Sequence, residues 1–156
     1  MLTGGAAASA IGGFTFRPNP DGSVSVDPAW VAANIRTETL PLVGDATCHR
    51  LVLPQLRGAL EELASRGLAE LVRSNDFGGC WVPRYIRSDP TGSLSLHSWG
   101  IAVDFNVSTN QRGTAGDMDP RVVEVMARWG FAWGGTWIDP DPMHFELAAL
   151  LQPAPQ

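Results

Sequence analysis

The chain has 156 residues, of which 44% are hydrophobic, and this length and composition are typical of one domain with one core. Its formal net charge is −5 and its 11 basic residues are scattered, so no cluster of cations could neutralise several phosphates of a nucleic acid. No apolar run approaches the roughly 18 residues that indicate a membrane span. We therefore expect a soluble, monomeric protein without a nucleic-acid partner.

Residues 1–26 are predicted to be an extension or linker, and residues 27–152 to form the folded domain. Residues 1–13 are rich in Ala, Gly and Ser and lack the positively charged start of a complete secretory signal. A turn is expected at 18–22. Asp27 followed by Pro28 predicts a helix start, because Asp can cap the helix and proline fits its first position, so a short helix should run through Trp30 and Ile35.

Residues 39–67 contain one segment with an ambiguous pattern and one with a clear helical pattern. Residues 39–49 mix turn and apolar residues and are predicted to be a loop with room for a short strand. Residues 53–67 are predicted to form a helix, because proline stands near its start and three leucines recur on one face. These leucines are Leu56, Leu60 and Leu63.

A β-hairpin is predicted from two apolar runs, 68–73 and 80–86, joined by a turn at 74–79. The second strand would carry Arg84 and Arg87 towards the following part of the chain. Because their numbers differ by an odd amount, only one of the two could face a given side of a regular strand.

The stretch 101–106 alternates apolar and polar residues, which predicts a half-buried strand with Asp104 projecting from one face. His97 lies on the turn that precedes it, and Gly100 would let that turn pass close. A carboxylate inside a strand is unfavourable unless something neutralises it. A divalent metal shared by Asp104 and His97 would do so.

The C-terminal third predicts a helix and two further strands. Asp119-Pro120 repeats the helix start seen earlier, and an apolar stripe then runs to Gly130, where the helix should end. Strands are expected at 131–133 and 144–147, the second presenting His144 and Glu146 on one face. Because helices and strands are mixed without regular βαβ alternation, we predict an α+β fold in which a small antiparallel sheet carries the site.

His97, Asp104 and His144 form a candidate metal-ligand set. Two imidazoles and one carboxylate, with a fourth position left for water, are typical of a catalytic zinc site rather than a closed structural one. Calcium binding by the acidic region from Asp117 to Asp141 is the weaker alternative, because imidazoles favour zinc over a cation that prefers oxygen ligands.

Two spaced motifs surround these ligands, Ser95-x-His97-x-x-Gly100-x-Ala102-x-Asp104 and Asp141-x-x-His144-Phe-Glu146. Together they resemble the peptidase M15 family, which comprises zinc D-alanyl-D-alanine carboxypeptidases, dipeptidases and L-alanyl-D-glutamate endopeptidases of bacterial cell-wall peptides. The resemblance is densest over 78–147 and extends more weakly to about Trp30. It implies a hedgehog/DD-peptidase-like fold, one zinc ion and a peptidoglycan peptide as substrate.

The resemblance also implies roles for individual residues. Asp141 stands at the position of the general base, with Asp139 as its local competitor; alternatively, both aspartates merely shape an Asp-Pro turn. Arg84 resembles the family's arginine upstream of the first ligand and would stabilise the developing oxyanion. Arg87 is the fallback, and a solvated surface arginine is the alternative for either position.

The remaining site candidates have two interpretations each. Ser95 could donate a hydrogen bond to substrate or cap a turn, and Glu146 is better placed to orient an imidazole than to bind metal. His49 has no acidic or cysteine partner at ligand spacing and is expected to be a surface or structural histidine. Three tryptophans are candidates for a groove wall or for the core, namely Trp99, Trp133 and Trp137.

Cys48 and Cys80 are the only two cysteines. A disulfide between them would stabilise an extracytoplasmic protein by about 3–4 kcal/mol according to the chain-entropy estimate. Two buried free thiols are the alternative. Neither residue lies near the two zinc motifs, so neither is expected to bind the metal.

We expect the bond cleaved to be the terminal D-alanyl-D-alanine bond, because the segments 80–84 and 133–137 look more like the carboxypeptidase branch than the dipeptidases. Arg87 and Arg112 are spare cations that could bind a substrate carboxylate. An L-alanyl-D-glutamate endopeptidase is one alternative, and a catalytically silent, zinc-stabilised wall-binding module is another, which would have no need of Asp141. The expected location is extracellular or cell-wall associated, or the protein is a phage-encoded lysin.

Overall fold

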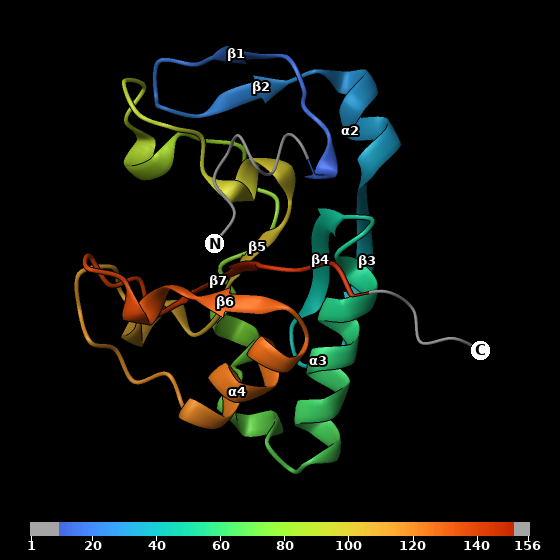
Figure 1. The fold of residues 1–156 in the computed structure, drawn as a ribbon, viewed down its shortest axis with the longest axis vertical. Coiled ribbons are helices and arrows are strands. Elements are labelled where there is room, and N and C mark those ends of the chain that lie inside the picture. The colour runs from blue at the N-terminus through green and yellow to red at the C-terminus, as the bar shows by residue number, and fades with distance from the viewer. Residues whose placement is uncertain (1–9, 152–156) are drawn as a thin grey trace.

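The structure, a computed structural model, describes residues 10–151 and shows the predicted α+β fold, with small antiparallel sheets and helices around one core. The helices are Pro28–Asn34 (α2), Leu53–Ser65 (α3) and Pro120–Arg128 (α4). The strands are Phe16–Pro18 (β1), Val24–Val26 (β2), Ile35–Leu40 (β3), Gly44–His49 (β4), Ala102–Asp104 (β5), Phe131–Trp133 (β6) and His144–Leu147 (β7). In Figure 1, β1, β2 and α2 lie at one end, α3 and α4 at the other, and β5, β6 and β7 between them.

A three-stranded antiparallel sheet with the order β5-β7-β6 lies at the centre of the fold. Its middle strand, β7, pairs with β5 so that Asp104 faces His144 and Ala102 faces Glu146. The strands predicted at 101–106, 131–133 and 144–147 are thus confirmed, although β5 is shorter than the alternating stretch. All of β7 is buried, because the sheet lies against helices on one side and loops on the other.

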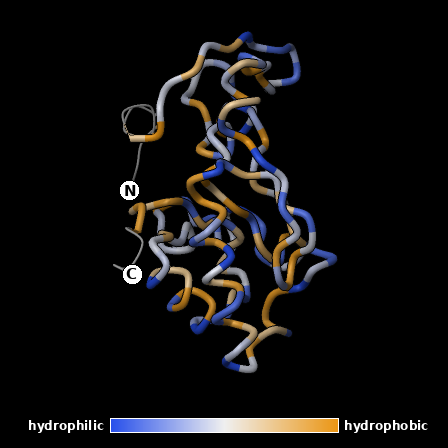
Figure 2. Tube along the Cα trace, turned by 90° about the vertical axis from the view of Figure 1, so that its right-hand side faces the viewer, coloured by the Kyte–Doolittle hydropathy of each residue, from blue (hydrophilic) through white to orange (hydrophobic). Residues whose placement is uncertain are grey.

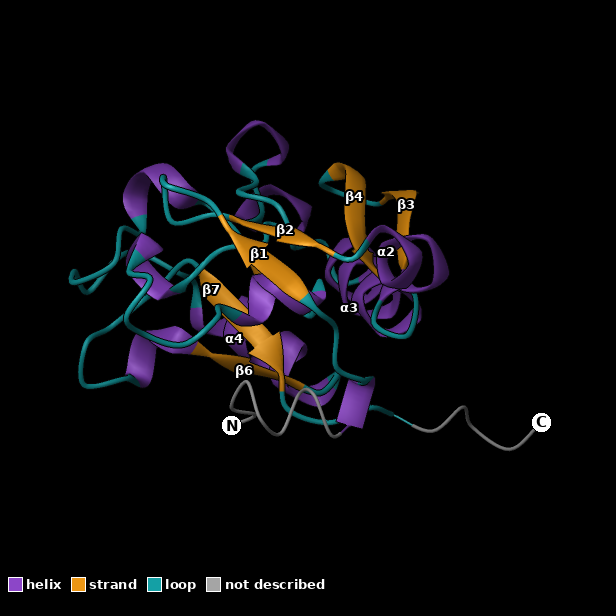
Figure 3. Ribbon diagram, turned by 90° about the horizontal axis from the view of Figure 1, so that it is seen from above, coloured by secondary structure: helices purple, strands orange, loops and turns teal. Residues whose placement is uncertain are grey.

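Helices α3 and α4 pack against each other and confirm the predicted helices at 53–67 and 119–130. The Asp119 side chain caps α4 by accepting a hydrogen bond from the Arg121 N–H, and Pro120 occupies the first turn as predicted. The two helices approach closely at Gly58, where an added Cβ would lie 2.3 Å from the Trp129 ring. Figure 3 shows α2, α3, β3 and β4 on one side and β6, β7 and α4 on the other.

Helix α2 confirms the predicted helix start at Asp27, whose side chain accepts a hydrogen bond from the Ala29 N–H at 3.0 Å. The helix ends before Ile35, which already belongs to β3. The segment 39–49, predicted as a loop with room for a short strand, contains such a strand, β4, but the pairing is more extensive than predicted, because β3 and β4, six residues each, form an antiparallel hairpin. Its outer face is polar but paired across the strands, as in the 2.7 Å contact between the Thr37 and Thr47 hydroxyls, so its sequence resembles that of a loop.

The hairpin predicted over 68–86 is wrong. Residues 69–71 and 74–76 form short 3₁₀ turns, and residues 77–85 pair with their neighbours only at isolated positions. The side chain of Asn106 takes the place of a partner strand: its amide donates to the Leu71 carbonyl at 2.8 Å and its oxygen accepts from the Arg73 N–H at 2.9 Å. A side chain more than thirty residues away therefore satisfies the backbone of a run that looks like a strand.

Strands β1 and β2 form a short hairpin around the turn predicted at 18–22. The hairpin is bound to the rest of the chain, because the Val24 N–H donates to the Pro83 carbonyl at 3.1 Å. The ring of Phe14 lies 4.8 Å from both Trp30 and Trp99. Residues 14–26 thus pack against the predicted domain; residues 1–9 of the predicted extension lie outside the described range.

A disulfide between Cys48 and Cys80 joins β4 to the segment that follows the 3₁₀ turns. Of the two alternatives for the cysteines, the bridge is confirmed, and the free thiols are wrong. Within residues 10–151, none of the helices has both the length and the apolar character needed to cross a membrane, and Figure 2 shows apolar and polar residues interleaved along the trace.

Candidate metal centre

Three elements bring the predicted ligands together. His97 lies in the 3₁₀ helix Leu96–Trp99, Asp104 ends β5, and His144 begins β7. Asp104 and His144 are forty residues apart in sequence but face each other across the β5–β7 ladder. Gly100, with a φ of 69°, turns the chain from the 3₁₀ helix into β5 close beside β4, where an added Cβ would lie 2.7 Å from the His49 backbone nitrogen.

The three side chains point at one another. Asp104 Oδ1 lies 3.2 Å from His97 Nε2 and 3.2 Å from His144 Nδ1, and the three candidate ligand atoms lie within 4.8 Å of one another. Ligands at the usual zinc distances in a tetrahedral site are separated by about 3.3 Å. His97, Asp104 and His144 can therefore hold a metal ion, and the two nitrogens and one oxygen fit zinc.

Each imidazole is oriented by a second partner on its far side. His97 Nδ1–H donates to the carbonyl oxygen of Cys80 at 2.8 Å, and His144 Nε2–H donates to Glu146 Oε2 at 3.0 Å. A carbonyl oxygen can only accept, so Nδ1 of His97 carries a proton, and Nε2 is the nitrogen that faces Asp104 and would bind a metal ion. Glu146 lies on the same face of β7 as His144, as the strand pattern predicted. The sequence contained no pattern that could have identified the Cys80 carbonyl as the partner of His97.

The site strongly perturbs the charged groups that form it. Burial alone would raise the pKa of Asp104, but hydrogen bonds from His144 and His97 outweigh burial and hold that pKa well below its usual range. Burial alone would lower the pKa of His144, but hydrogen bonds to Asp104 and Glu146 raise it to about 9. These buried carboxylates therefore favour a positive charge between them, supplied by protons or by a metal ion.

The two aspartates of the second motif have different surroundings. Asp141 is 9% exposed, its Oδ1 has no hydrogen-bond partner among the described residues, and burial raises its pKa. Asp139 is more exposed and forms ion pairs with Arg87 and with Arg112, whose Nε lies 2.8 Å away. Arg112 also approaches Asp141, at 3.7 Å. The structure thus leaves one oxygen of Asp141 available, while Asp139 is occupied by two arginines.

Arg84 and Arg87 do not lie on a strand, so the expectation that strand geometry would choose between them is wrong. The Arg84 backbone is fixed beside the helix of His97: its N–H donates to Ser98 Oγ at 3.0 Å and its carbonyl accepts from the Ser95 N–H at 2.9 Å. Arg87 lies in the exposed turn Ile86–Ser88 with a φ of 54°. Its guanidinium group is bound to Asp139.

Ser95 caps the helix of His97, because its Oγ accepts a hydrogen bond from the His97 N–H at 3.3 Å. Of the two interpretations of Ser95, the structure therefore shows the cap of a turn. Among the tryptophans, Trp99 is buried in the core, whereas the Trp137 ring lies 5.3 Å from the His144 ring. Trp133 is half-buried, and its indole N–H donates to the Pro142 carbonyl at 2.8 Å.

His49 is a buried structural histidine, so the surface interpretation is wrong. Its Nδ1 accepts a hydrogen bond from the Leu51 N–H at 3.2 Å, and burial lowers its pKa to about 4. The acidic residues considered for calcium have separate partners. Asp117 accepts hydrogen bonds from Thr109 and Asn110, and Asp119 caps α4.

Comparison with known families adds an independent observation. Residues 88–147 match the family described as D-alanyl-D-alanine carboxypeptidase. The comparisons with curated proteins and with solved structures each found no match. The matched range includes His97, Asp104, Asp141 and His144, but it begins after Arg84 and so leaves that residue out.

The sequence resemblance is confirmed by this match, which covers both motifs and most of the stretch in which the resemblance is densest. The convergence of the three ligands inside the matched range agrees with it. Residues 88–147 are thus similar to the D-alanyl-D-alanine carboxypeptidase domain of the peptidase M15 family.

Proposed function

We propose that this protein is a zinc metallopeptidase that releases the terminal D-alanine from peptidoglycan stem peptides. The observation that carries the proposal is the convergence of His97, Asp104 and His144 within a match to a D-alanyl-D-alanine carboxypeptidase family. Family membership implies a peptide substrate, and the geometry of the three ligands supports a metal-dependent mechanism.

One zinc ion would be held by His97 Nε2, an oxygen of Asp104 and His144 Nδ1, with the Cys80 carbonyl and Glu146 keeping both lone pairs directed inwards. When bound, zinc lowers the pKa of water to about 7 and polarises a carbonyl group. The protein must then supply a group for the proton of the attacking water and a cation for the oxyanion.

Asp141 is the proposed proton acceptor and donor. It has a buried oxygen with no hydrogen-bond partner among the described residues, and its pKa is raised by burial, an effect to which the nearby charge of Asp104 adds. A raised pKa brings the carboxyl group closer to the pH at which it can take up a proton and return it to the leaving amine. The two arginines on Asp139 make that residue the poorer candidate.

Arg84 is the proposed cation for the developing oxyanion. Its backbone lies beside Ser95 and Ser98, which flank His97, whereas the guanidinium group of Arg87 is already paired with Asp139. Ser95 is proposed to contact the substrate with its hydroxyl hydrogen, since its oxygen accepts from the His97 N–H. Both assignments follow the spacing of the motifs and the placement of these backbones.

The disulfide supports an extracytoplasmic location, because such bonds persist in oxidising compartments. A cell-wall substrate is consistent with that location. The L-alanyl-D-glutamate endopeptidase remains the second candidate for the bond cleaved. The silent wall-binding module is the third, and the buried Asp141 oxygen, which has no partner within residues 10–151, argues against it.

The deciding experiment combines metal analysis of the purified protein with incubation of a pentapeptide stem, read by mass spectrometry. The proposal expects one zinc per chain and the products tetrapeptide and free D-alanine. Cleavage after L-alanine with the D-alanyl-D-alanine end intact would identify the endopeptidase. Zinc binding without cleavage of either bond in the pentapeptide would identify the silent module.

A further inference from the structure

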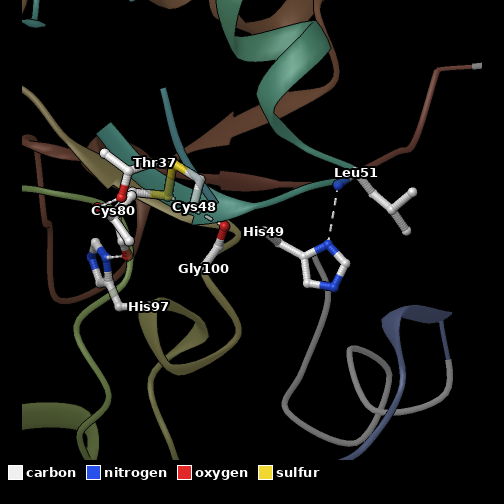
Figure 4. The surroundings of a disulfide bond; sticks show 8 residues. Thr37, Cys48, His49, Leu51, Cys80, His97 and Gly100 are labelled. Atoms are coloured by element: carbon white, nitrogen blue, oxygen red, sulfur yellow. Dashed lines mark hydrogen bonds between the residues drawn. A yellow bond between two sulfur atoms is a disulfide. The ribbon is translucent and has the colours of Figure 1, made fainter. Parts of the chain in front are cut away.

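Cys80 connects the disulfide to the metal centre. Its sulfur is bonded to Cys48 of β4, and its backbone carbonyl accepts the hydrogen bond from His97 Nδ1–H at 2.8 Å. Figure 4 shows the two interactions leaving the same residue on opposite sides. The covalent cross-link is therefore one residue away from a candidate zinc ligand.

The segment 78–82, here called the strap, connects both ligand-bearing segments to β4. It has no continuous strand pairing, and Gly79 forms only an isolated bridge with Asp104. Its main-chain hydrogen bonds to these neighbours are Gly78 N–H to Asp104 O (2.8 Å), Asp104 N–H to Gly79 O (3.2 Å), Trp81 N–H to Thr47 O (2.8 Å) and Val82 N–H to His97 O (3.1 Å). The disulfide adds the one covalent attachment of the strap to β4.

The two imidazoles differ in how their orienting partners are held. Glu146 is two residues from His144 on the central strand of the sheet, so its position follows from the β5-β7-β6 ladder. The Cys80 carbonyl is seventeen residues from His97, on a segment without a ladder. Hydrogen bonds weaken steeply with distance and angle, so a small displacement of the strap would release His97 but not His144.

We propose that the Cys48–Cys80 disulfide sets the zinc affinity of the site, because it holds the Cys80 carbonyl against His97. Cys80 is thus a positioning residue that acts through His97, and this inference rests on the proposed zinc site. Reductive opening breaks the S–S bond with two electrons and two protons and gives two thiols. With a phosphine as the reductant, the phosphine takes up the oxygen of a water molecule and becomes the phosphine oxide.

The test compares zinc dissociation constants, measured by chelator competition, of the oxidised protein and the variant Cys48→Ala/Cys80→Ala, which leaves no thiol to bind zinc. We expect the variant to bind zinc at least about tenfold more weakly, in line with the usual effect of losing the partner of a ligating histidine. Leu60→Ala is the matched control, because it truncates a buried side chain in α3, which packs on α4 and β3. Its zinc affinity should equal that of the wild type.

A second readout separates positioning from a general loss of stability. In nitrogen-15-labelled, zinc-loaded protein, the His97 Nδ1 proton should exchange with solvent faster when the disulfide is absent. The His144 Nε2 proton, held by Glu146, should not change. If the double variant does not fold, zinc release from loaded wild-type protein into excess chelator, with and without the phosphine, gives the same comparison and should be about tenfold faster after reduction.

The outcomes separate the inference from the proposed function. Equal zinc affinity and equal exchange of the His97 proton with and without the disulfide would overturn the inference and leave the zinc peptidase intact. A loss of affinity in Leu60→Ala as large as that in the double variant would also overturn it. Oxidised wild-type protein that binds no zinc would instead contradict the proposed function itself.

Discussion

The metal centre and the neighbouring segment 84–92, here called the arginine segment, are built in opposite ways. The ligands are buried, and two of them are fixed opposite each other by the β5–β7 ladder. The arginine segment is mostly exposed, has positive φ angles at Arg87 and Ser88, and is connected to Asp139 by an ion pair between side chains. Backbone pairing thus fixes two of the three candidate metal ligands, whereas side-chain contacts help to place the nearby cations.

This comparison predicts the largest effect for the ligands. His97→Ala, Asp104→Ala and His144→Ala should each abolish stoichiometric zinc binding and D-alanine release, because two remaining ligands leave too few contacts to retain the metal. Metal analysis of the purified variants measures the first effect, and release of D-alanine from a pentapeptide measures the second. Asp117→Ala is the control, since its carboxylate is bound to Thr109 and Asn110 instead.

Asp141→Asn tests the proposed proton transfer without removing a ligand. It keeps the shape of the side chain but cannot act as a base, so turnover should fall by about a hundredfold or more while zinc is retained. Asp139→Asn is the matched control, because its carboxylate pairs with Arg87 and Arg112. Near-normal turnover in Asp141→Asn together with a large loss in Asp139→Asn would exchange the two roles.

Within the arginine segment, Arg84→Ala should lower kcat by about a hundredfold, the lower range for removing a group that stabilises an oxyanion. It should change KM less, because the charge on the carbonyl oxygen develops mainly in the transition state. Arg87→Ala should leave kcat close to the wild-type value, since its guanidinium group is paired with Asp139. Steady-state kinetics of both variants would reveal a reversed order, which would move the role to Arg87.

The pH dependence of zinc binding tests the electrostatics of the metal centre. Zinc must displace the Nδ1 proton of His144, whose pKa is raised to about 9 by Asp104 and Glu146 in spite of burial. The apparent affinity should therefore rise about tenfold per pH unit below 9 and level off above it. Glu146→Gln removes one of the two carboxylates that raise the pKa, so this break should move to lower pH. An unchanged break would show that Glu146 does not influence His144.

The sequence was most informative where one periodicity decides where a side chain lies. The alternation around Asp104 and the spacing of His144 and Glu146 were enough to predict strands, and the β5–β7 ladder then brings Asp104 and His144 together. The helix starts at Asp27 and Asp119 were equally predictable, because a cap and a proline act within one turn. The candidate ligands depend on such local signals.

The errors arose where distant groups satisfy the backbone. The run 68–73 has the composition of a strand, but the Asn106 side chain binds the Leu71 carbonyl and the Arg73 N–H, and no local pattern reveals that partner. The Cys80 carbonyl could not be predicted as the partner of His97, because every residue has a carbonyl group and only the tertiary path of the strap selects this one. The strands β3 and β4 were hard to predict because polar side chains such as Thr37 and Thr47 pair across the outer face of the hairpin, so the sequence looks like that of a loop.

The most direct test of the central claim is a titration of metal-depleted protein with zinc, in which D-alanine release from a pentapeptide stem is followed at each addition. If His97, Asp104 and His144 hold a single catalytic zinc ion, activity should rise linearly and stop rising at one zinc per chain. The His144→Ala protein should remain inactive throughout the titration. Full activity of the wild type before any zinc is added, or one bound zinc without D-alanine release, would contradict the account.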